Sequence, residues 1–198
     1  MADFAPDVKL ELRCATRSQW LDAVRGDFGR FLQDHAACEA KASAMAIHIA
    51  KHYPDKIDIV EAMTELAVEE LAHFRDVVRR LHAEALTLAP DTPDAYVNAL
   101  LSHMRRGREP FMLDRLLIAA IVEARGHERF ALLARALDEG ESKRFYESIS
   151  RSEARHYQLF LDLALAHFDT SEVGARLDEL LRIEADIVNA LPNRAALH

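Results

Sequence analysis

Two glutamate–histidine pairs with identical spacing are the residues in this sequence best suited to chemistry. Glu70 and His73 stand in the segment ELAH, and Glu153 and His156 stand in EARH. In an α-helix a step of three residues returns to nearly the same face with a rise of about 4.5 Å. Each pair can therefore contribute two ligands to one metal ion, because carboxylate and imidazole both bind divalent transition metals.

Each pair is preceded by a single glutamate on another apolar helical stripe, 31 residues earlier in one half of the chain and 30 in the other. One Glu from each of two helices and Glu-x-x-His from each of two others is the ligand set of di-iron and di-manganese carboxylate bundles. Four carboxylates and two imidazoles balance the charge of two divalent ions, whereas structural zinc prefers a closed set that often contains Cys. The ligand set does not distinguish iron from manganese. The predicted metal ligands are Glu39, Glu70, His73, Glu123, Glu153 and His156.

Each of these residues alone could be an ordinary surface acid or a histidine near the core. Six of them at matching depth on four helices favour a metal site instead. Further residues near the ligands are candidates for orienting them, since a metal-bound histidine usually donates its second ring N–H to a carboxylate or carbonyl. Each of these could instead face solvent. The candidates are Asp34, His35, Glu69 and, ranked below them, His127. Glu128 is rotated away from Glu123 and is expected to be a surface or salt-bridge residue.

Long helices are needed to position such ligands, and the composition predicts them. Half of the 198 residues are hydrophobic, with only six Gly and six Pro. Helix breakers and the 3.6-residue period predict six helices. Their expected ranges are about 16–52 with a break near Gly26 and Gly29, 55–86, 95–106, 114–140, 142–168 and 170–191. We expect an all-α fold, a ferritin-like four-helix bundle with additional short helices, as a single domain over residues 1–198.

The formal net charge of −8 argues against a protein that coats nucleic acid by bulk electrostatics. Two arginine clusters remain candidates for a local basic patch, although such runs more often form solvated helix faces. They are Arg75, Arg79 and Arg80, and Arg105, Arg106 and Arg108. Cys14 and Cys38 are too few for a disulfide framework, and no signal or membrane segment is recognisable, so we expect a cytoplasmic protein with free thiols.

The segments around the predicted ligands resemble the MiaE-type tRNA hydroxylases, from about Trp20 to Phe168. The matching segments are DHAACEAK at 34–41, EELAHF at 69–74, IVEAR at 121–125, ERF at 128–130 and SEARH at 152–156. The resemblance implies a non-haem di-iron monooxygenase that uses O₂ and hydroxylates the isopentenyl group of 2-methylthio-N6-isopentenyl adenosine in the tRNA anticodon loop. It also implies that the six predicted ligands hold two iron ions.

No flavin or nicotinamide motif is present, so we expect electrons from a separate reductase or ferredoxin-like partner. A local cationic rim would suffice to hold the RNA, because phosphate contacts position a nucleic acid while a pocket reads the base. The candidates for this rim are Lys41, Arg105, Arg106 and Arg108. Two other functions remain open: an iron-storage or ferroxidase protein, and a di-iron oxidase that acts on a small metabolite or lipid.

Overall fold

The computed structural model describes residues 8–90 and 92–198. Over these residues the chain contains seven helices and no strand, as expected for an all-α protein. No helix in this part of the chain is both long enough and apolar enough to cross a membrane. The helices are α1 (Ser18–Gly26), α2 (Phe28–His52), α3 (Ile57–Ala83), α4 (Ala95–Leu101), α5 (Arg108–Ala136), α6 (Glu141–His167) and α7 (Thr170–Ala190).

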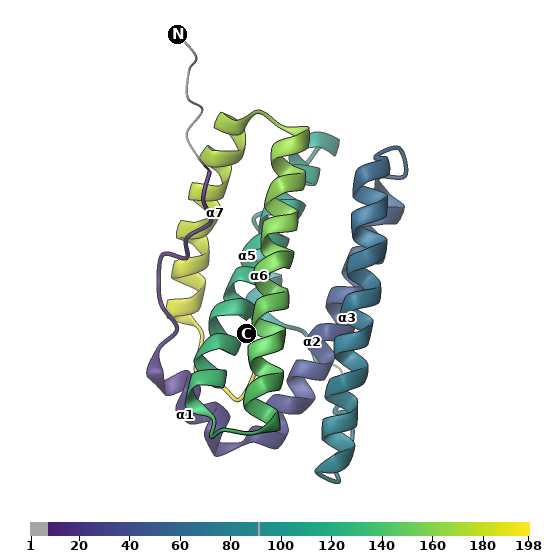
Figure 1. The fold of residues 1–198 in the computed structure, drawn as a ribbon. Coiled ribbons are helices and arrows are strands. Elements are labelled where there is room, and N and C mark those ends of the chain that lie inside the picture. The colour runs from purple at the N-terminus through teal and green to yellow at the C-terminus, as the bar shows by residue number, and fades with distance from the viewer. Residues whose placement is uncertain (1–7, 91) are drawn as a thin grey trace. The chain divides into compact units, whose positions relative to one another are not determined.

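The chain folds into two compact units, of which the second contains α1, α2 and α3. In this α1–α3 unit, α2 and α3 run antiparallel side by side (Figure 1). The apolar side of α3 is buried and consists of Ile59, Met63, Leu66, Val77 and Leu81. Residues 193–197 belong to the same unit, where the Trp20 indole donates to the Ala196 carbonyl at 2.8 Å.

The other unit contains α4, α5, α6 and α7 together with residues up to Thr16. Its main contact is between the antiparallel helices α5 and α6, with α7 packed against α4, α5 and α6 (Figure 1). Helix α5 is buried along most of its length and supplies Leu116, Leu117, Ile121, Phe130 and Leu133 to the core.

The first predicted helix is two helices, which accounts for seven elements instead of six. Asp27, between Gly26 and Phe28, has a non-helical backbone (φ −149°, ψ 71°), and its side chain accepts a hydrogen bond from the Arg30 amide at 3.0 Å. This is an N-cap, so α2 starts anew after α1 has ended.

The end of α3 also differs from the prediction. The helix stops at Ala83 and not at the predicted Leu86, because Ala85 adopts a left-handed backbone (φ 56°) and the Leu86 amide donates to Leu81 O at 2.8 Å.

The predicted start of the third long helix at Asp114 is wrong, since α5 begins six residues earlier at Arg108. Gly107 has a positive φ of 100° and precedes the helix. Pro110 then lies in the first turn, where its missing N–H has no intrahelical partner to lose. The helix before it is correspondingly shorter than predicted and ends at Leu101.

Candidate metal centre

The α1–α3 unit brings three of the predicted ligands together. Glu39 from the middle of α2 and Glu70 from α3 are buried, and His73 is nearly so. His73 Nδ1 lies 3.1 Å from Glu70 Oε2 and 3.7 Å from Glu39 Oε2. Burial lowers the pKa of His73, but hydrogen bonds to Glu39 and Glu70 outweigh it and raise the pKa to about 10. Two buried carboxylates that lie beside the same imidazole favour a cation next to them.

His35 orients one of these carboxylates. It lies one turn before Glu39 on α2, is fully buried, and its Nε2 is 2.6 Å from Glu39 Oε1. The imidazole N–H in this position restricts the rotation of the Glu39 carboxylate, as partners around metal ligands usually do. Glu69, a second predicted helper, is more exposed and lies 3.9 Å from His73 Nε2.

The α4–α7 unit presents the other three predicted ligands on α5 and α6. Glu123, Glu153 and His156 are all buried, at 7%, 3% and 3% exposure. His156 Nδ1 lies 3.4 Å from Glu153 Oε2, and no described residue donates a hydrogen bond to that oxygen. A buried carboxylate oxygen without a donor is costly unless a cation or a protonated group meets it. Each unit therefore offers two buried carboxylates and one imidazole, a donor set that fits a divalent transition metal.

His127 on α5 forms hydrogen bonds with Ser150 on α6. Its Nδ1 lies 2.7 Å from the Ser150 carbonyl oxygen and 3.0 Å from Ser150 Oγ. The ring also lines a hollow of about 270 Å³ together with Cys14, Glu128 and Tyr157. The described contacts of His127 thus position the helix pair that carries Glu123 and Glu153.

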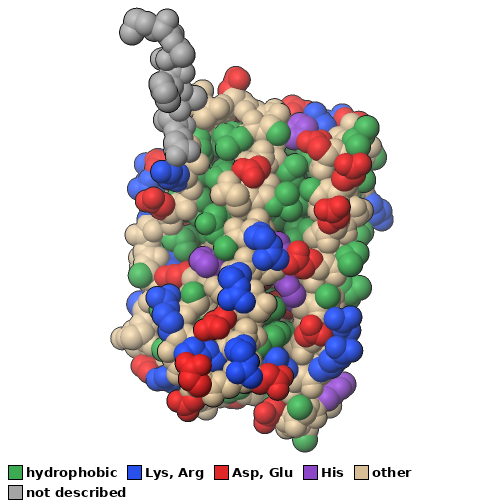
Figure 2. Space-filling model, viewed as in Figure 1, with side chains coloured by type: hydrophobic (Ala, Val, Ile, Leu, Met, Phe, Trp, Pro, Cys, Tyr) green, Lys and Arg blue, Asp and Glu red, His purple; other side chains and the backbone are tan. Residues whose placement is uncertain are grey.

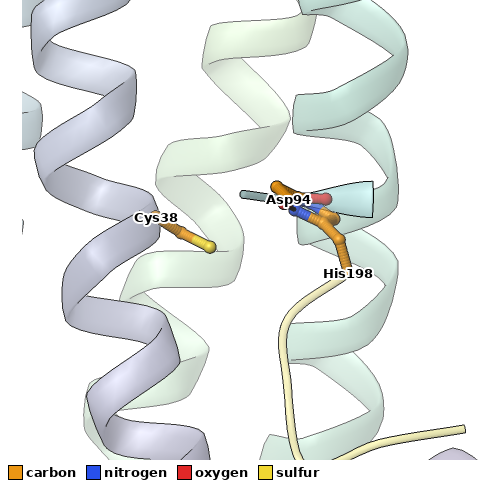
Figure 3. A group of neighbouring side chains, drawn as sticks. All are labelled: Cys38, Asp94 and His198. Atoms are coloured by element: carbon orange, nitrogen blue, oxygen red, sulfur yellow. Dashed lines mark hydrogen bonds and ion pairs between the residues drawn. The ribbon is translucent and has the colours of Figure 1, made fainter. Parts of the chain in front are cut away.

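Asp34 contacts the end of the chain instead of a predicted ligand. Its Oδ2 accepts a hydrogen bond from the Leu197 amide at 2.6 Å. In the other unit a second aspartate meets the last residue: Asp94 caps α4 through the Val97 amide and lies 3.0 Å from His198 Nδ1 (Figure 3). Burial raises the pKa of Asp94, but the bond to His198 outweighs this and holds the pKa well below its usual range.

Two of the four residues predicted for an RNA rim are engaged in contacts within the protein. Lys41 Nζ donates to the Thr92 carbonyl at 2.6 Å, which holds the segment before α4 along α2. Arg105 donates to the buried Asp114, which Arg176 also contacts at 2.8 Å. Arg106 and Arg108 are exposed.

A buried charge network in the α4–α7 unit was missed by the sequence analysis. Arg125, two residues after Glu123, is fully buried and donates to both oxygens of the buried Glu184 at 2.8 and 3.0 Å. Tyr96 donates to Glu184 at 3.0 Å, and Glu128 pairs with Arg125 and accepts from the Thr16 amide. Glu128 is thus the salt-bridge residue that was expected. Burial lowers the pKa of Arg125, but the carboxylate of Glu184 outweighs it and raises the pKa above its usual value.

The only sequence signal for this network was the position of Arg125 in the segment IVEAR, shortly after the apolar run at 116–122. Its partners could not be identified, because Glu184 lies 59 residues away along the chain. The network connects α4, α5 and α7, and so holds the turn of α5 that carries Glu123.

The family match and the similar proteins of known name all indicate the same family. Residues 4–198 match the family described as tRNA-(MS[2]IO[6]A)-hydroxylase (MiaE). A Pseudomonas putida protein named tRNA 2-(methylsulfanyl)-N(6)-isopentenyladenosine(37) hydroxylase is 34% identical over 98% of this chain and 94% of its own length. The protein of the same name from Salmonella typhimurium is 28% identical over 89% of this chain and 83% of its own.

A solved structure is similar over almost the whole chain. It is protein 43 with aldehyde deformylating oxygenase activity from Synechococcus, 32% identical, with a TM-score of 0.88 over 93% of this chain and 92% of that one. This similarity confirms the predicted all-α, ferritin-like fold class. Because the family match covers nearly all residues and agrees with the relatives' names, this chain belongs to the MiaE family of tRNA hydroxylases.

Proposed function

We propose that this protein hydroxylates the isopentenyl group of 2-methylthio-N6-isopentenyl adenosine at position 37 of tRNA, with O₂ as co-substrate. One observation carries the proposal: in a chain that belongs to this family, each unit places two buried carboxylates beside one imidazole. Four carboxylates and two imidazoles form the ligand set of a di-metal carboxylate site, which supports this assignment.

We further propose that the six residues Glu39, Glu70, His73, Glu123, Glu153 and His156 hold two iron ions. When bound, iron supplies the O₂ activation needed to insert oxygen into an unactivated C–H bond. The protein supplies the ligands and their orientation. His35 fixes the Glu39 carboxylate, and the Arg125–Glu184 pair holds α5 around Glu123.

The overall reaction defines what must come from outside. One oxygen atom enters the substrate as hydroxyl and the other leaves as water, which consumes two electrons and two protons. We propose that a separate reductase or ferredoxin-like protein delivers the electrons. Modified tRNA as the substrate would place the enzyme in the cytoplasm.

Metal content of ligand variants tests the metal assignment. Wild-type protein loaded anaerobically with ferrous iron should retain two iron ions per chain, measured by elemental analysis. Glu70→Gln and Glu123→Gln preserve side-chain volume but remove a charged ligand, one from each unit, and should each lower iron content and hydroxylation. Glu65→Gln on the exposed side of α3 is the matched control. Two ions retained by Glu123→Gln would contradict its assignment as a ligand.

Product analysis tests the reaction itself. tRNA carrying the isopentenyl modification is incubated with reduced enzyme and O₂, digested and analysed by mass spectrometry for a gain of one oxygen atom. The similarity to the Synechococcus protein makes aldehyde deformylation a second candidate activity. Conversion of a long-chain aldehyde without any oxidation of tRNA would favour that candidate. Large oligomers that accumulate mineral iron would instead favour storage.

A further inference from the structure

One side of α3 is a continuous line of exposed side chains. Its members recur every three or four residues, which places them on one side of a helix. The buried residues of α3, such as Met63 and Leu81, lie on the opposite side. We refer to six members of the line as the α3 face: Glu61, Glu65, Val68, Leu71, Arg75 and Arg79.

The centre of the α3 face is apolar. Val68 is 70% exposed and Leu71 is 56% exposed, and the two lie one helical turn apart. Single exposed apolar side chains are normal on a folded protein, but neighbouring ones are typical of a contact surface. The centre of a protein–protein interface is likewise rich in apolar side chains and poor in charge.

Charge changes sign across this apolar centre. Between Ile57 and Glu69, α3 carries four acidic residues and no Lys or Arg, whereas between Leu71 and Ala83 it carries three arginines and one aspartate. Figure 2 shows the same order at the right of the view, where acidic side chains lie over the upper part of α3 and Lys and Arg side chains over its lower part.

The helix dipole does not account for this order. It favours acids near the amino end of a helix and bases near the carboxyl end, but its effect is confined to the first and last turns. Glu65 and Arg75 each lie eight residues inside α3, more than two turns from the nearer end. The two charged flanks therefore need another explanation.

A second copy of the same face would be complementary in both charge and polarity. In a symmetric dimer both copies use one face, so that residue i meets residue j and residue j meets residue i. We place the two-fold axis at the apolar centre, with the two α3 helices antiparallel, and count outward. The facing pairs are then Val68 with Leu71, Glu65 with Arg75 and Glu61 with Arg79. A parallel arrangement would bring like charges together, which disfavours it.

Asp76 does not prevent this pairing. Its carboxylate lies 3.2 Å from both Arg75 Nε and Arg79 Nη1, so two guanidinium groups share one acid. A guanidinium has five N–H donors, and each arginine can therefore bind a second carboxylate beside Asp76. The face from Glu61 to Arg79 is about 27 Å long, which two helices that cross at about 20° can cover.

We propose that this chain forms a symmetric dimer through the α3 face, with the two α3 helices antiparallel. The inference needs neither a bound metal nor tRNA, so it does not depend on the proposed function. It places the interface on the helix that carries Glu70, which is buried on the opposite side of α3.

The test exchanges charges across the interface. Sedimentation velocity of the wild-type chain at increasing protein concentration and low salt should show a species of twice the chain mass of 22.4 kDa. Glu65→Arg and Arg75→Glu each create two like-charge contacts in the dimer, so either variant alone should raise the dissociation constant by about tenfold or more.

A mixture of the two variants is the decisive sample. In a dimer of one Glu65→Arg copy and one Arg75→Glu copy, the two new charges face each other and the two unchanged residues face each other. Both contacts are again between opposite charges, so the mixture should dimerise about as tightly as the wild type. Glu172→Arg and Arg182→Glu reverse exposed charges on α7 and are the controls, which should dimerise like the wild type.

The outcomes are independent of activity on tRNA. A wild-type chain that stays monomeric at the highest concentration would overturn the proposal, and so would a dimer that neither variant weakens or that the α7 controls weaken equally. Two variants that do not associate when mixed would reject the antiparallel arrangement and with it the proposed interface. A monomeric chain whose reduction by an acidic ferredoxin is slowed by Arg75→Glu would assign the face to the electron donor. Circular dichroism confirms that each variant is folded, and an intact dimer without tRNA hydroxylation would count against the proposed function alone.

Discussion

Removing the Glu184 carboxylate should destabilise the α4–α7 unit strongly. Glu184 is fully buried and accepts three hydrogen bonds, from Arg125 Nε at 2.8 Å, Arg125 Nη2 at 3.0 Å and the Tyr96 hydroxyl at 3.0 Å. The variant Glu184→Ala leaves the Arg125 guanidinium buried without its main counter-charge. It also leaves the Tyr96 hydroxyl without its acceptor.

The magnitude follows from these contacts. Breaking a buried ion pair by removing one partner costs about 3–5 kcal/mol. Arg125 retains Glu128 and the Cys14 carbonyl, so we expect the lower end of that range. For a domain of this size each kcal/mol lowers Tm by about 2–4 °C, so a loss of about 3 kcal/mol corresponds to roughly 6–12 °C.

The assay is thermal unfolding of the metal-free protein by circular dichroism, which excludes effects of metal binding. Glu179→Ala is the control, because Glu179 also pairs with an arginine, at 2.7 Å from Arg176, but is 55% exposed. Exposed pairs contribute about 0–1 kcal/mol, so its Tm should fall by no more than about 4 °C. A Tm for Glu184→Ala that is no lower than that of the control would refute the reasoning about the buried network.

Two further predictions concern single carboxylates. Burial raises the pKa of Asp114, but Arg176 and Arg105 outweigh it and hold the pKa below its ordinary value of 3.8. Its contribution to stability is therefore present above about pH 4 and lost as pH falls through the lowered pKa. In urea unfolding, Asp114→Asn should be less stable than the wild type at pH 7, and the gap should narrow below pH 4. A gap that does not depend on pH would contradict this, and Asp162→Asn, on the exposed side of α6, is the control. Asp34→Ala removes the acceptor of the Leu197 amide, a charged hydrogen bond of about 1.5–3 kcal/mol, so hydrogen exchange at Leu197 should accelerate by roughly tenfold or more. Exchange at the wild-type rate would show that other contacts hold residues 193–197.

Local signals predicted most of the helical fold. The apolar period of α3 and α5 identified the buried positions, because a helix of these lengths must bury one face whatever packs on it. The errors lay at helix ends. Gly107 and Pro110 indicated a break, but only the backbone conformation shows that they begin α5 instead of separating it from α4. Gly and Pro interrupt helices and also start them, so their presence alone does not decide between the two.

The candidate site was identified largely from spacing, because Glu-x-x-His is a local pattern that a helix converts directly into geometry. The structure adds two contacts of Glu39. One is with His73 on the neighbouring helix α3, and the other is with His35 on the same helix. Whether the six residues bind iron stays a prediction.

Long-range partners were decided by the tertiary structure alone. Arg125 meets Glu184 because α7 packs on α5, and nothing in the local sequence of either residue specifies that contact. The buried side of α6 was decided in the same way, because which side a helix buries depends on all the residues that pack against it.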